Sequence, residues 1–430
     1  MEKKMLLISS FFWQEDKLAA IRIRANIKYL QELGWQIVVI TKKWDNDCRD
    51  ISVVGETKVY SIEDPFTELV FRRQGSRSRT SQGKLKPLLY YRIRNHAKKL
   101  ARQTLRLVSI FRWTGKAVSI GREMVREEGI RYLFCSVPDI ETLMAGARIK
   151  REHSHIKLIE EIRDPLSMNS LWVPEQSFFV NYLMARWEKE YIKDVDRFVY
   201  LTENIRSIYT STYGHINPHV FTGVVITNGY DPHDYEHIRS NPIKDKCVFS
   251  HTGSLYGERN PFIFLEALKK HLAKNPSHFE KVLCYFVGNV EDELEKKLML
   301  FAAHQQMDSV IHLQGIVPHQ KAVEYGMNAT VNLLITHRRG SEYAIPGKLF
   351  EYIGARRPIL AISDDPLVVK LIMDHGLGWV CSHTNIDALE KTIAAILSAY
   401  EKGELHGIHK ETEAFNRKKL MERLDQYVLK

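Results

Sequence analysis

The sequence predicts an α/β protein built from two doubly wound domains, each around a mainly parallel sheet. Three observations predict this fold. The chain has 430 residues, enough for two or three domains. Short apolar segments alternate with amphipathic ones, and the alternation restarts after a turn-rich segment at 228–232. Hydrophobic residues make up 44% and charged residues 27% of the chain, which is typical of globular proteins and excludes global disorder.

The N-terminal segment predicts a strand–helix–strand unit. Residues 5–10 are apolar and predict a strand, although 5–13 also superficially resembles a signal peptide without a cleavage site. Helical spacing predicts a helix over 19–33, and a second strand follows at 36–41. Such a unit implies a parallel sheet with right-handed crossovers. The loop between the first strand and the helix has no glycine, which argues against a dinucleotide-binding fingerprint.

The remaining elements follow the same alternation. Further strands of the first domain are expected at 132–136, 156–162, 197–202 and 224–227. In the second domain, strands are expected at 247–252, 282–287, 310–313, 329–335 and 358–362, and helices at 261–272, 291–304, 319–325 and from 348. A last helix is expected over 411–429. We predict that the first domain covers 1–230 and the second 231–410.

The net charge of +10 is concentrated in one segment. Residues 72–122 contain fifteen Lys and Arg residues and no Asp or Glu. Within it, 85–113 has helical spacing, with apolar residues along one side and Arg92, Lys98, Lys99 and Arg102 among the basic residues of the other. This pattern predicts a helix on an anionic membrane surface, with Phe111 and Trp113 as anchors. An ordinary domain helix with a solvated basic face is the alternative, and nucleic acid is disfavoured because no binding signature accompanies the charge.

The cysteines and the acidic motifs do not predict metal or disulfide chemistry. The five cysteines are far apart and form no C-x-x-C pair, which favours free thiols in a reducing cytoplasm. Two D-x-D motifs, at 45–47 and 194–196, are interpreted as structural, and His215, His219 and His233 lack metal-site spacing. No apolar stretch is long enough to cross a membrane. We therefore expect no metal and no cofactor.

A phosphate and ribose site is predicted around 342–352. Ile-Pro-Gly at 345–347 precedes a helix that begins near Lys348, so its free backbone N–H groups and the Lys348 charge favour an anion. Glu351, one turn later, can accept hydrogen bonds from two vicinal hydroxyls. A helix cap with a surface ion pair is the simpler alternative.

A second segment, 249–261, reads as strand, glycine-containing loop and helix. It lies where the first strand of the second sheet ends, and ligands of doubly wound sheets bind beyond such ends. Gly253 permits close backbone approach, and the planar fork of Arg259 suits a diphosphate.

With these segments in order, the chain resembles the GT-B glycosyltransferases, and most closely the retaining family 4 group of bacterial polysaccharide enzymes. Further motifs in the expected order carry the resemblance: Arg24 in the first helix, Ser136-Val137-Pro138, Glu161-Ile162-Arg163-Asp164-Pro165, Ile226-Thr227-Asn228-Gly229-Tyr230-Asp231 and Gln314-Gly315-Ile316-Val317-Pro318. The resemblance implies two Rossmann-like domains that face each other across a cleft, with 411–430 returning to the first domain.

The resemblance also implies the roles of the site residues. Arg259 and Lys348 would hold the donor diphosphate, and Glu351 would bind ribose. Gly253, Gly347 and Leu349 would complete this part of the donor site, and Gly315, Ile316 and Val317 would face the nucleobase. Arg24, Arg163 and Asp164 would meet the acceptor, with Glu342 as a further catalytic carboxylate.

The sequence departs from the group's pattern at three places. The second carboxylate of its Glu-x7-Glu pattern would fall on Tyr343, and Glu342 is one residue away. Pro138-Asp139-Ile140-Glu141 stands where many relatives have a histidine, and the first loop is not glycine-rich.

These observations predict a metal-independent retaining glycosyltransferase. It would use a nucleoside-diphosphate-sugar and a glycan acceptor, lipid-linked, at the cytoplasmic face of the membrane, in the synthesis of surface polysaccharide such as capsule or lipopolysaccharide. Two alternatives remain open: a sugar-nucleotide epimerase on the same fold, and a non-catalytic nucleotide-sugar-binding subunit of an assembly complex.

Overall fold

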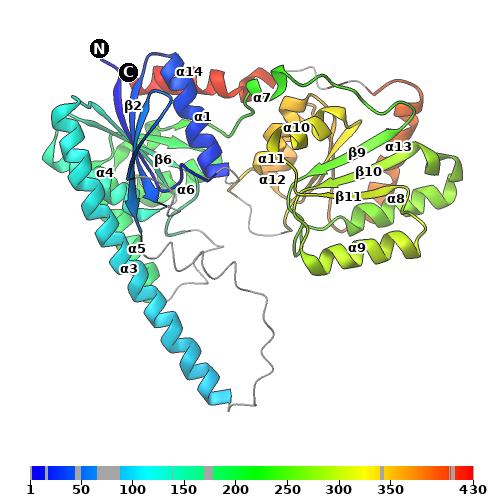
Figure 1. Cartoon of the computed structure of the whole chain (residues 1–430), viewed down its shortest axis with the longest axis horizontal. Helices are drawn as coiled ribbons and strands as arrows, with labels where there is room; N and C mark the ends of the chain where they lie inside the picture. The colour runs from blue at the N-terminus through cyan, green and yellow to red at the C-terminus, as the bar shows by residue number, and fades with distance from the viewer. Residues whose placement is uncertain are drawn as a thin grey trace. The chain divides into compact units, whose positions relative to one another are not determined.

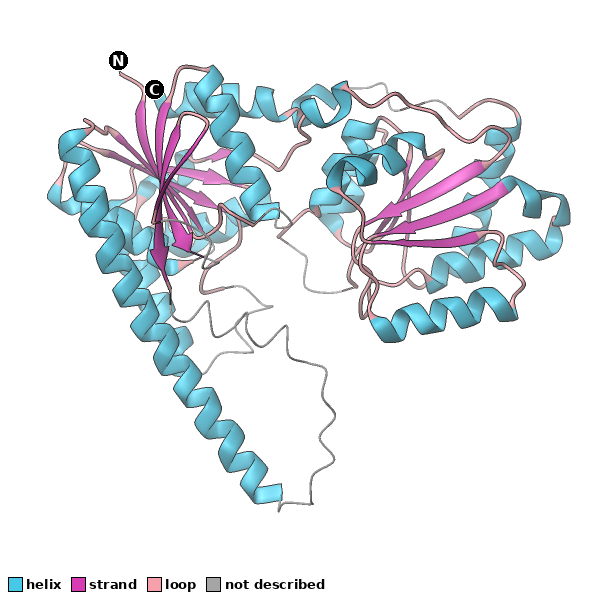
Figure 2. Cartoon of the chain, in the orientation of Figure 1, coloured by secondary structure: helices cyan, strands magenta, loops and turns pink. Residues whose placement is uncertain are grey.

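The computed structural model describes residues 2–14, 18–43, 50–64, 88–137, 139–168, 178–338, 343–405, 407 and 412–429. The chain divides into two compact units, which are Met1–Ile226 with Met421–Lys430, and Thr227–Leu420. Each unit contains a sheet flanked by helices (Figures 1 and 2). This confirms the α/β fold class with two parallel-sheet domains.

The first unit contains an eight-stranded sheet in the order β3-β4-β2-β1-β5-β6-β7-β8. The strands are β1 Lys4–Ser9, β2 Gln36–Lys43, β3 Ile51–Val54, β4 Thr57–Glu63, β5 Tyr132–Val137, β6 Lys157–Ile162, β7 Arg197–Tyr200 and β8 Val224–Val225. β3 pairs antiparallel with β4, and the other neighbours pair in parallel. The hairpin of β3 and β4 at the sheet edge is an addition to the predicted strands.

Helices cover both faces of this sheet. They are α1 Leu18–Glu32, α3 Leu88–Glu127, α4 Ile140–Glu152, α5 Phe178–Tyr191 and α6 Glu203–Tyr213. Successive residues of β6 point to opposite faces. Glu161 forms an ion pair with Arg22 of α1, whereas a Cβ added at Gly146 of α4 would meet the side chain of Leu158. Helices α1 and α4 therefore lie on opposite faces.

The second unit contains a six-stranded parallel sheet in the order β11-β10-β9-β12-β13-β14. Its strands are β9 Cys247–Thr252, β10 Val282–Val287, β11 Ile311–Gly315, β12 Val331–Ile335, β13 Ile359–Ile362 and β14 Gly378–Cys381. Its helices are α7 His233–Glu236, α8 Phe262–Lys274, α9 Asp292–His304, α10 His319–Asn328, α11 Gly347–Ala355, α12 Pro366–Asp374 and α13 Ile386–Glu401.

Alternating residues of β12 show that this sheet too is covered on both faces. Leu333 belongs to a hydrophobic cluster with α8, α9 and α13, whereas Leu334 belongs to a second cluster with α11 and α12. The four cysteines of the described chain, Cys135, Cys247, Cys284 and Cys381, are free and buried. Their burial fits the prediction of unpaired thiols, and Cys48 lies outside the described residues.

The C-terminal helix α14, Arg417–Leu429, returns to the first unit as predicted. Asp425 forms an ion pair with Lys3 at 2.8 Å and accepts a hydrogen bond from the Trp35 indole at 2.7 Å. Leu424 and Val428 are buried. Polar and apolar contacts thus fix the end of the chain beside the start of the first sheet.

Helix α3 is longer than the sequence predicted and extends beyond the sheet of its unit (Figure 1). Its apolar stripe continues past 113 through Ala117, Val118 and Met124, which are buried. Trp113 is only 1% exposed, so the prediction that it anchors the helix at a surface is wrong: the indole belongs to the core of its own unit. Phe111 is half exposed and contacts Trp187 of α5. Among the described helices, none has the length and apolar character needed to span a membrane.

Buried charges attach α3 to the sheet. The Lys42 ammonium, at the end of β2, lies 2.5 Å from Glu141 and 3.1 Å from Asp64. Arg106 of α3 donates to both Glu141 oxygens at 2.8 and 3.0 Å. Arg106, expected on the solvated basic side of the helix, is therefore an internal ion-pair partner. Burial alone would raise the pKa of Glu141, but Arg106 and Lys42 lower it to about 2.

We predict that Glu141→Gln lowers the free energy of unfolding by roughly 3–5 kcal/mol, because Lys42 and Arg106 lose the carboxylate that compensates their burial. The difference from wild type should be largest above the usual carboxyl pKa of 4.5 and should shrink as pH falls toward 2, where Glu141 becomes protonated in the folded protein. Urea unfolding at pH 7 and pH 3 measures both effects.

Glu123→Gln, on the exposed side of the same helix, is the matched control and should change the unfolding midpoint little. Equal effects of the two substitutions would contradict the internal role of Glu141.

Candidate functional site

The strand order of the second sheet has a switch point between β9 and β12. These neighbouring strands are followed by connections that lead to opposite sides, from β9 toward β10 and from β12 toward β13. In open parallel sheets such a switch point leaves a crevice at the carboxyl ends of the strands. The loop after β9 carries Gly253 and Arg259, and α11 follows β12. The fold therefore gathers the two segments that the sequence predicted to bind a nucleotide diphosphate.

Tyr352 fixes α11 to the ends of both strands. Its hydroxyl accepts a hydrogen bond from the Thr252 backbone N–H at 2.8 Å and donates to the Leu333 carbonyl at 3.3 Å. On the other side of α11, the Tyr235 hydroxyl donates to the Glu351 carbonyl at 2.8 Å. A Cβ at Gly354 would lie 2.5 Å from the Tyr235 ring, so glycine is required for this close packing.

The first turn of α11 presents positive charge. Lys348 and Glu351 are partly exposed, and their side chains form an ion pair at 2.6 Å. The helix N-terminus at Gly347 adds the partial positive charge of its unpaired N–H groups. Leu349 differs from the other predicted donor residues, because its side chain is fully buried and its N–H donates to the Pro346 carbonyl. Leu349 therefore supports the site from the core.

The loop after β9 leaves a notch at Gly253. A Cβ placed there would lie 3.4 Å from Nε2 of His251 and 3.8 Å from Cγ of Lys348. The Arg259 guanidinium stacks over the Tyr256 ring at 5.6 Å, and its Nε is buried without a hydrogen-bond partner in the described chain. The Tyr256 hydroxyl in turn contacts Nε2 of His337 at 3.1 Å.

The loop after β11 is also at the carboxyl edge of this sheet. Gly315 adopts a φ of +64°, a conformation that favours glycine, and its carbonyl accepts from the Gly288 N–H at 2.7 Å. Ile316 is 79% exposed and Val317 partly exposed. An apolar side chain this exposed is available to pack against a flat ring, and the role at the nucleobase remains a prediction.

Electrostatic coupling shows that these residues share one environment. Burial lowers the pKa of His251 to about 4, a bond to the Leu333 carbonyl opposes this, and Arg259 and Lys348 lower it further. A hydrogen bond to Asp234 raises the pKa of His319, with Glu351 acting in the same direction. The structure thus brings Arg259, Lys348 and Glu351 together, as the sequence predicted. It adds His251 and His319, which no motif in the sequence singled out.

In the first unit, the predicted acceptor residues lie at the carboxyl ends of β1 and β6. Arg24 donates to the Phe12 carbonyl at 2.5 Å and so holds the loop that follows β1. Arg163 follows β6 and its guanidinium lies 5.8 Å from the Phe11 ring centroid. Burial lowers the pKa of Arg163 and raises that of Asp164, while their mutual attraction opposes both shifts. Arg24 therefore supports the loop after β1, and Arg163 and Asp164 attract each other at the end of β6.

Two further features that the sequence predicted are the carboxylate at Glu342 and the D-x-D motif at 194–196. Glu342 lies outside the described residues, and Tyr343, at the position of the expected carboxylate, is buried. Asp194 and Asp196 form ion pairs with Arg151 and Lys150, which agrees with their interpretation as structural residues.

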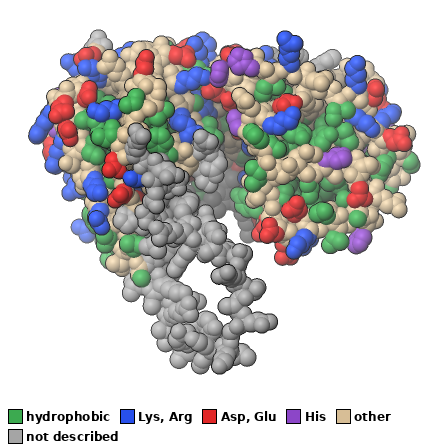
Figure 3. All heavy atoms as spheres, in the orientation of Figure 1, with side chains coloured by type: hydrophobic (Ala, Val, Ile, Leu, Met, Phe, Trp, Pro, Cys, Tyr) green, Lys and Arg blue, Asp and Glu red, His purple; other side chains and the backbone are tan. Residues whose placement is uncertain are grey.

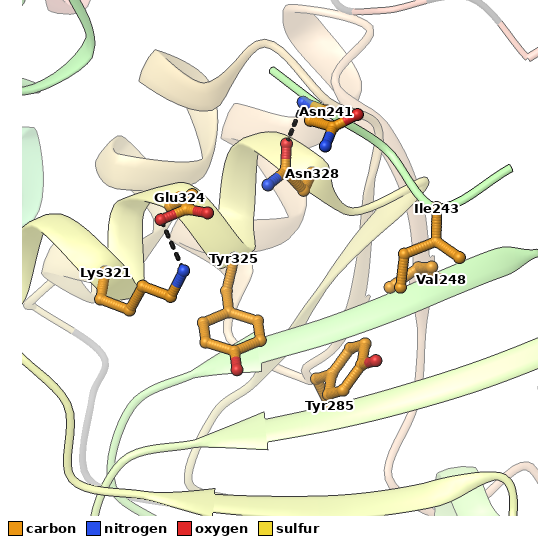
Figure 4. Close-up of a pocket in the computed structure, with 8 residues that line it drawn as sticks. All are labelled: Asn241, Ile243, Val248, Tyr285, Lys321, Glu324, Tyr325 and Asn328. Carbon is orange, nitrogen blue, oxygen red and sulfur yellow. Dashed lines mark hydrogen bonds and ion pairs between the residues drawn. The ribbon is translucent and has the colours of Figure 1, made fainter. Parts of the chain in front are cut away.

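One cavity and one group of potential metal ligands in the described chain contain none of the predicted donor residues. A cavity of about 130 Å³ opens between α10 and the sheet of the second unit, with Tyr285 and Tyr325 beside each other in its wall (Figure 4). No predicted donor residue lines it. In the described chain, His233, Glu236 and His237 are exposed and close enough to share a metal ion. The expectation that the protein needs no metal stays a prediction.

Comparison with solved structures identifies the architecture. The chain is similar to sucrose-phosphate synthase from Thermosynechococcus elongatus, with 12% identity, a TM-score of 0.61, and coverage of 99% of this chain and 98% of that one. It is similar to Anabaena Alr3699/HepE in complex with UDP, with 12% identity, a TM-score of 0.62 and 99% coverage of both chains. A glycosyltransferase from Rickettsia africae matches with 11% identity, a TM-score of 0.61, and coverage of 99% and 97%.

At these identities the similarity establishes the fold, which is the GT-B fold of glycosyltransferases, as the sequence motifs predicted. Neither protein-family models nor curated protein sequences give a match to the chain.

Proposed function

We propose that this protein is a metal-independent, retaining glycosyltransferase that transfers a sugar from a UDP-sugar to a lipid-linked glycan acceptor. The observation that carries the proposal is the group at the β9–β12 switch point. There Lys348, at the N-terminus of α11, lies beside the notch at Gly253, and Arg259 is on the same loop as Gly253. This is a site for a diphosphate, and Glu351 lies one turn away to bind vicinal hydroxyls.

The donor assignment draws on the structural neighbours and on electrostatics. Anabaena HepE, which has the same fold, was crystallised with UDP and with UDP-glucose. Departure of a nucleoside diphosphate concentrates negative charge on the leaving phosphate, and preorganised cations stabilise that charge. Arg259 and Lys348 supply two such cations, so the reaction does not require a metal ion for this purpose.

The acceptor side of the proposal rests on the first unit. Arg163 and Asp164 follow the inner strand β6, and Arg24 holds the neighbouring loop. Burial raises the pKa of Asp164, opposed by Arg163, so this carboxyl is the candidate to exchange a proton with the acceptor hydroxyl. Glu342 is the second candidate carboxylate. The products would be surface polysaccharides, such as capsule or lipopolysaccharide.

Donor binding gives a direct test. Arg259→Ala and Lys348→Ala should each weaken UDP-glucose binding about tenfold or more, because a charge-assisted hydrogen bond contributes about 1.5–3 kcal/mol. Isothermal titration calorimetry measures the affinities. Lys321→Ala is the control, since Lys321 is an exposed partner of Glu324 on α10 and should have no effect.

Glu351→Gln supplies a second readout in the same titrations. It should reduce the preference for UDP over 2′-deoxy-UDP, whereas Lys348→Ala should weaken both ligands alike. Unchanged affinity in both cation variants would overturn the proposed donor site.

Transfer itself is tested by product analysis. With UDP-glucose and a lipid-linked glycan fraction as acceptor, the product should carry an α-glycosidic bond, the configuration of the donor, as read by NMR. Asp164→Asn should lower the transfer rate without weakening donor binding. Conversion of the donor to another nucleotide sugar in the absence of acceptor would identify an epimerase, and donor binding without turnover would favour a non-catalytic subunit.

The basic segment 72–122 would place the enzyme at the cytoplasmic face of an anionic membrane. On the face drawn in Figure 3, the basic and acidic side chains of the described residues are interspersed. Apolar side chains from α3 and α5 are exposed beside the basic segment, and Phe111 of α3 contacts Trp187 of α5. These exposed residues are Val108, Phe111, Phe179 and Tyr182, each between 47% and 61% exposed. Basic charge next to exposed aromatic groups is the combination that binds a lipid interface.

Membrane docking predicts salt-sensitive binding to anionic vesicles, because exposed charges are screened over about 10 Å at 0.1 M salt. Reversal of Arg92, Lys98, Lys99 and Arg102 to Glu should abolish vesicle flotation and leave UDP-glucose binding intact. Phe179→Ser should weaken flotation at every salt concentration. Equal flotation with neutral and anionic vesicles, or none with either, would refute docking by this segment.

A further inference from the structure

The buried imidazole of His251 is an unused polar group at the candidate donor site. It lies at the end of β9, next to Phe286 of β10 and the Leu333 carbonyl of β12. Its Nδ1 is 2.9 Å from that carbonyl, which can only accept a hydrogen bond, so Nδ1 carries the proton. Nε2 therefore presents a lone pair. It is buried and has no hydrogen-bond partner in the described chain.

The direction of Nε2 connects it to the ligand site. The space that a side chain would fill at Gly253 is bounded by Nε2 at 3.4 Å and by Lys348. A ligand that packs against the bare Gly253 backbone therefore approaches both groups. Arg259 Nε, on the loop that also carries Gly253, is a second buried polar atom without a partner in the described chain. Buried polar atoms are almost always paired in folded proteins, so the unpaired Nε2 beside Gly253 indicates a ligand that completes it.

We propose that His251 is a further donor-binding residue: when the diphosphate of a nucleotide sugar enters the notch at Gly253, Nε2 takes up a proton and donates a hydrogen bond to a phosphate oxygen. The inference rests on the proposed function, since it concerns the same donor site. The proton comes from solvent, and no covalent bond to the ligand forms or breaks. The imidazolium then lies between the Leu333 carbonyl and the phosphate, with a hydrogen-bond acceptor at each nitrogen.

The charges around His251 explain why its imidazole is neutral in the free protein and becomes protonated when the ligand binds. In the free protein, burial lowers the pKa of His251 to about 4, the Leu333 carbonyl opposes this, and the Arg259 and Lys348 cations lower it further. A diphosphate neutralises both cations and adds negative charge beside Nε2, which raises the pKa of His251 in the complex. Donor affinity should therefore rise as pH falls through the pKa of the complex, and level off near that of the free protein.

The test is calorimetry with UDP-glucose at pH 6 to 7.5, in buffers that differ in ionisation enthalpy. UDP-glucose is chosen over UDP because both its phosphates are esterified, so the ligand itself does not titrate in this range. Wild-type protein should take up a measurable fraction of a proton on binding, and that fraction should grow as pH falls. His251→Asn keeps an amide that can donate to the Leu333 carbonyl but lacks Nε2. It should bind about tenfold or more weakly and take up no proton through this residue.

His304, an exposed histidine at the end of α9, is the control. In His304→Gln the proton uptake should persist. Uptake that is unchanged in His251→Asn, or affinity unchanged by His251→Asn, overturns the inference while Lys348-dependent binding keeps the proposed donor site. If the wild-type protein binds no nucleotide sugar, both proposals fail.

Discussion

The Tyr352 hydroxyl connects the central elements of the second unit. Tyr352 Oη accepts from the Thr252 N–H at the last residue of β9 and donates to a carbonyl of β12, so a single side chain joins the first helix after β12 to the two central strands. Burial raises the pKa of Tyr352 to about 12, with bonds from Thr252 opposing, which keeps the hydroxyl protonated and able to make both bonds. The positions of Gly253, His251 and Lys348 relative to one another follow from this attachment. A parallel sheet alone would bring the loops to one edge but would not set the helix that carries Lys348.

The two units use charge in different ways. Around Glu141 in the first unit, cations and carboxylates compensate one another within the protein, and that arrangement stabilises the position of α3. At the proposed donor site the compensation is incomplete. Lys348 has a carboxylate partner in Glu351, but Nε of the Arg259 cation is buried without a hydrogen-bond partner in the described chain. Such an unpaired donor favours an anion, because a cation already paired internally must first give up its partner.

Local patterns in the sequence predicted the elements that are buried on both faces. The strands at 247–252 and 282–287 were expected with the observed bounds, because an apolar run begins each strand and continues through the whole of the second. The edge hairpin of β3 and β4 was missed, since β3 has only four residues and they are mostly exposed, so no buried apolar run marks it. Lys348 and Glu351 were found because they lie one turn apart on one helix. His251 was not, because its relevance arises from the empty space at Gly253 and a carbonyl eighty-two residues away in sequence.

Helix α3 shows why composition alone could not separate the two interpretations of its charge. The interpretation as an ordinary domain helix holds for the C-terminal part of α3, and membrane docking stays a prediction for its N-terminal part. Toward the C-terminal end, Arg106 and Arg122 pair with Glu141 and Glu152 of α4, and Trp113 packs in the core, as in an ordinary domain helix. The acidic partners in these ion pairs come from another helix. Counting charged residues within 72–122 therefore cannot reveal them. The N-terminal part of α3 also lacks acidic residues in its sequence, but it extends beyond the sheet of its unit (Figure 1). The ion pairs of Arg106 attach the C-terminal part of the helix to its own unit, and they use none of the basic residues at 92–102 on which the proposed docking depends.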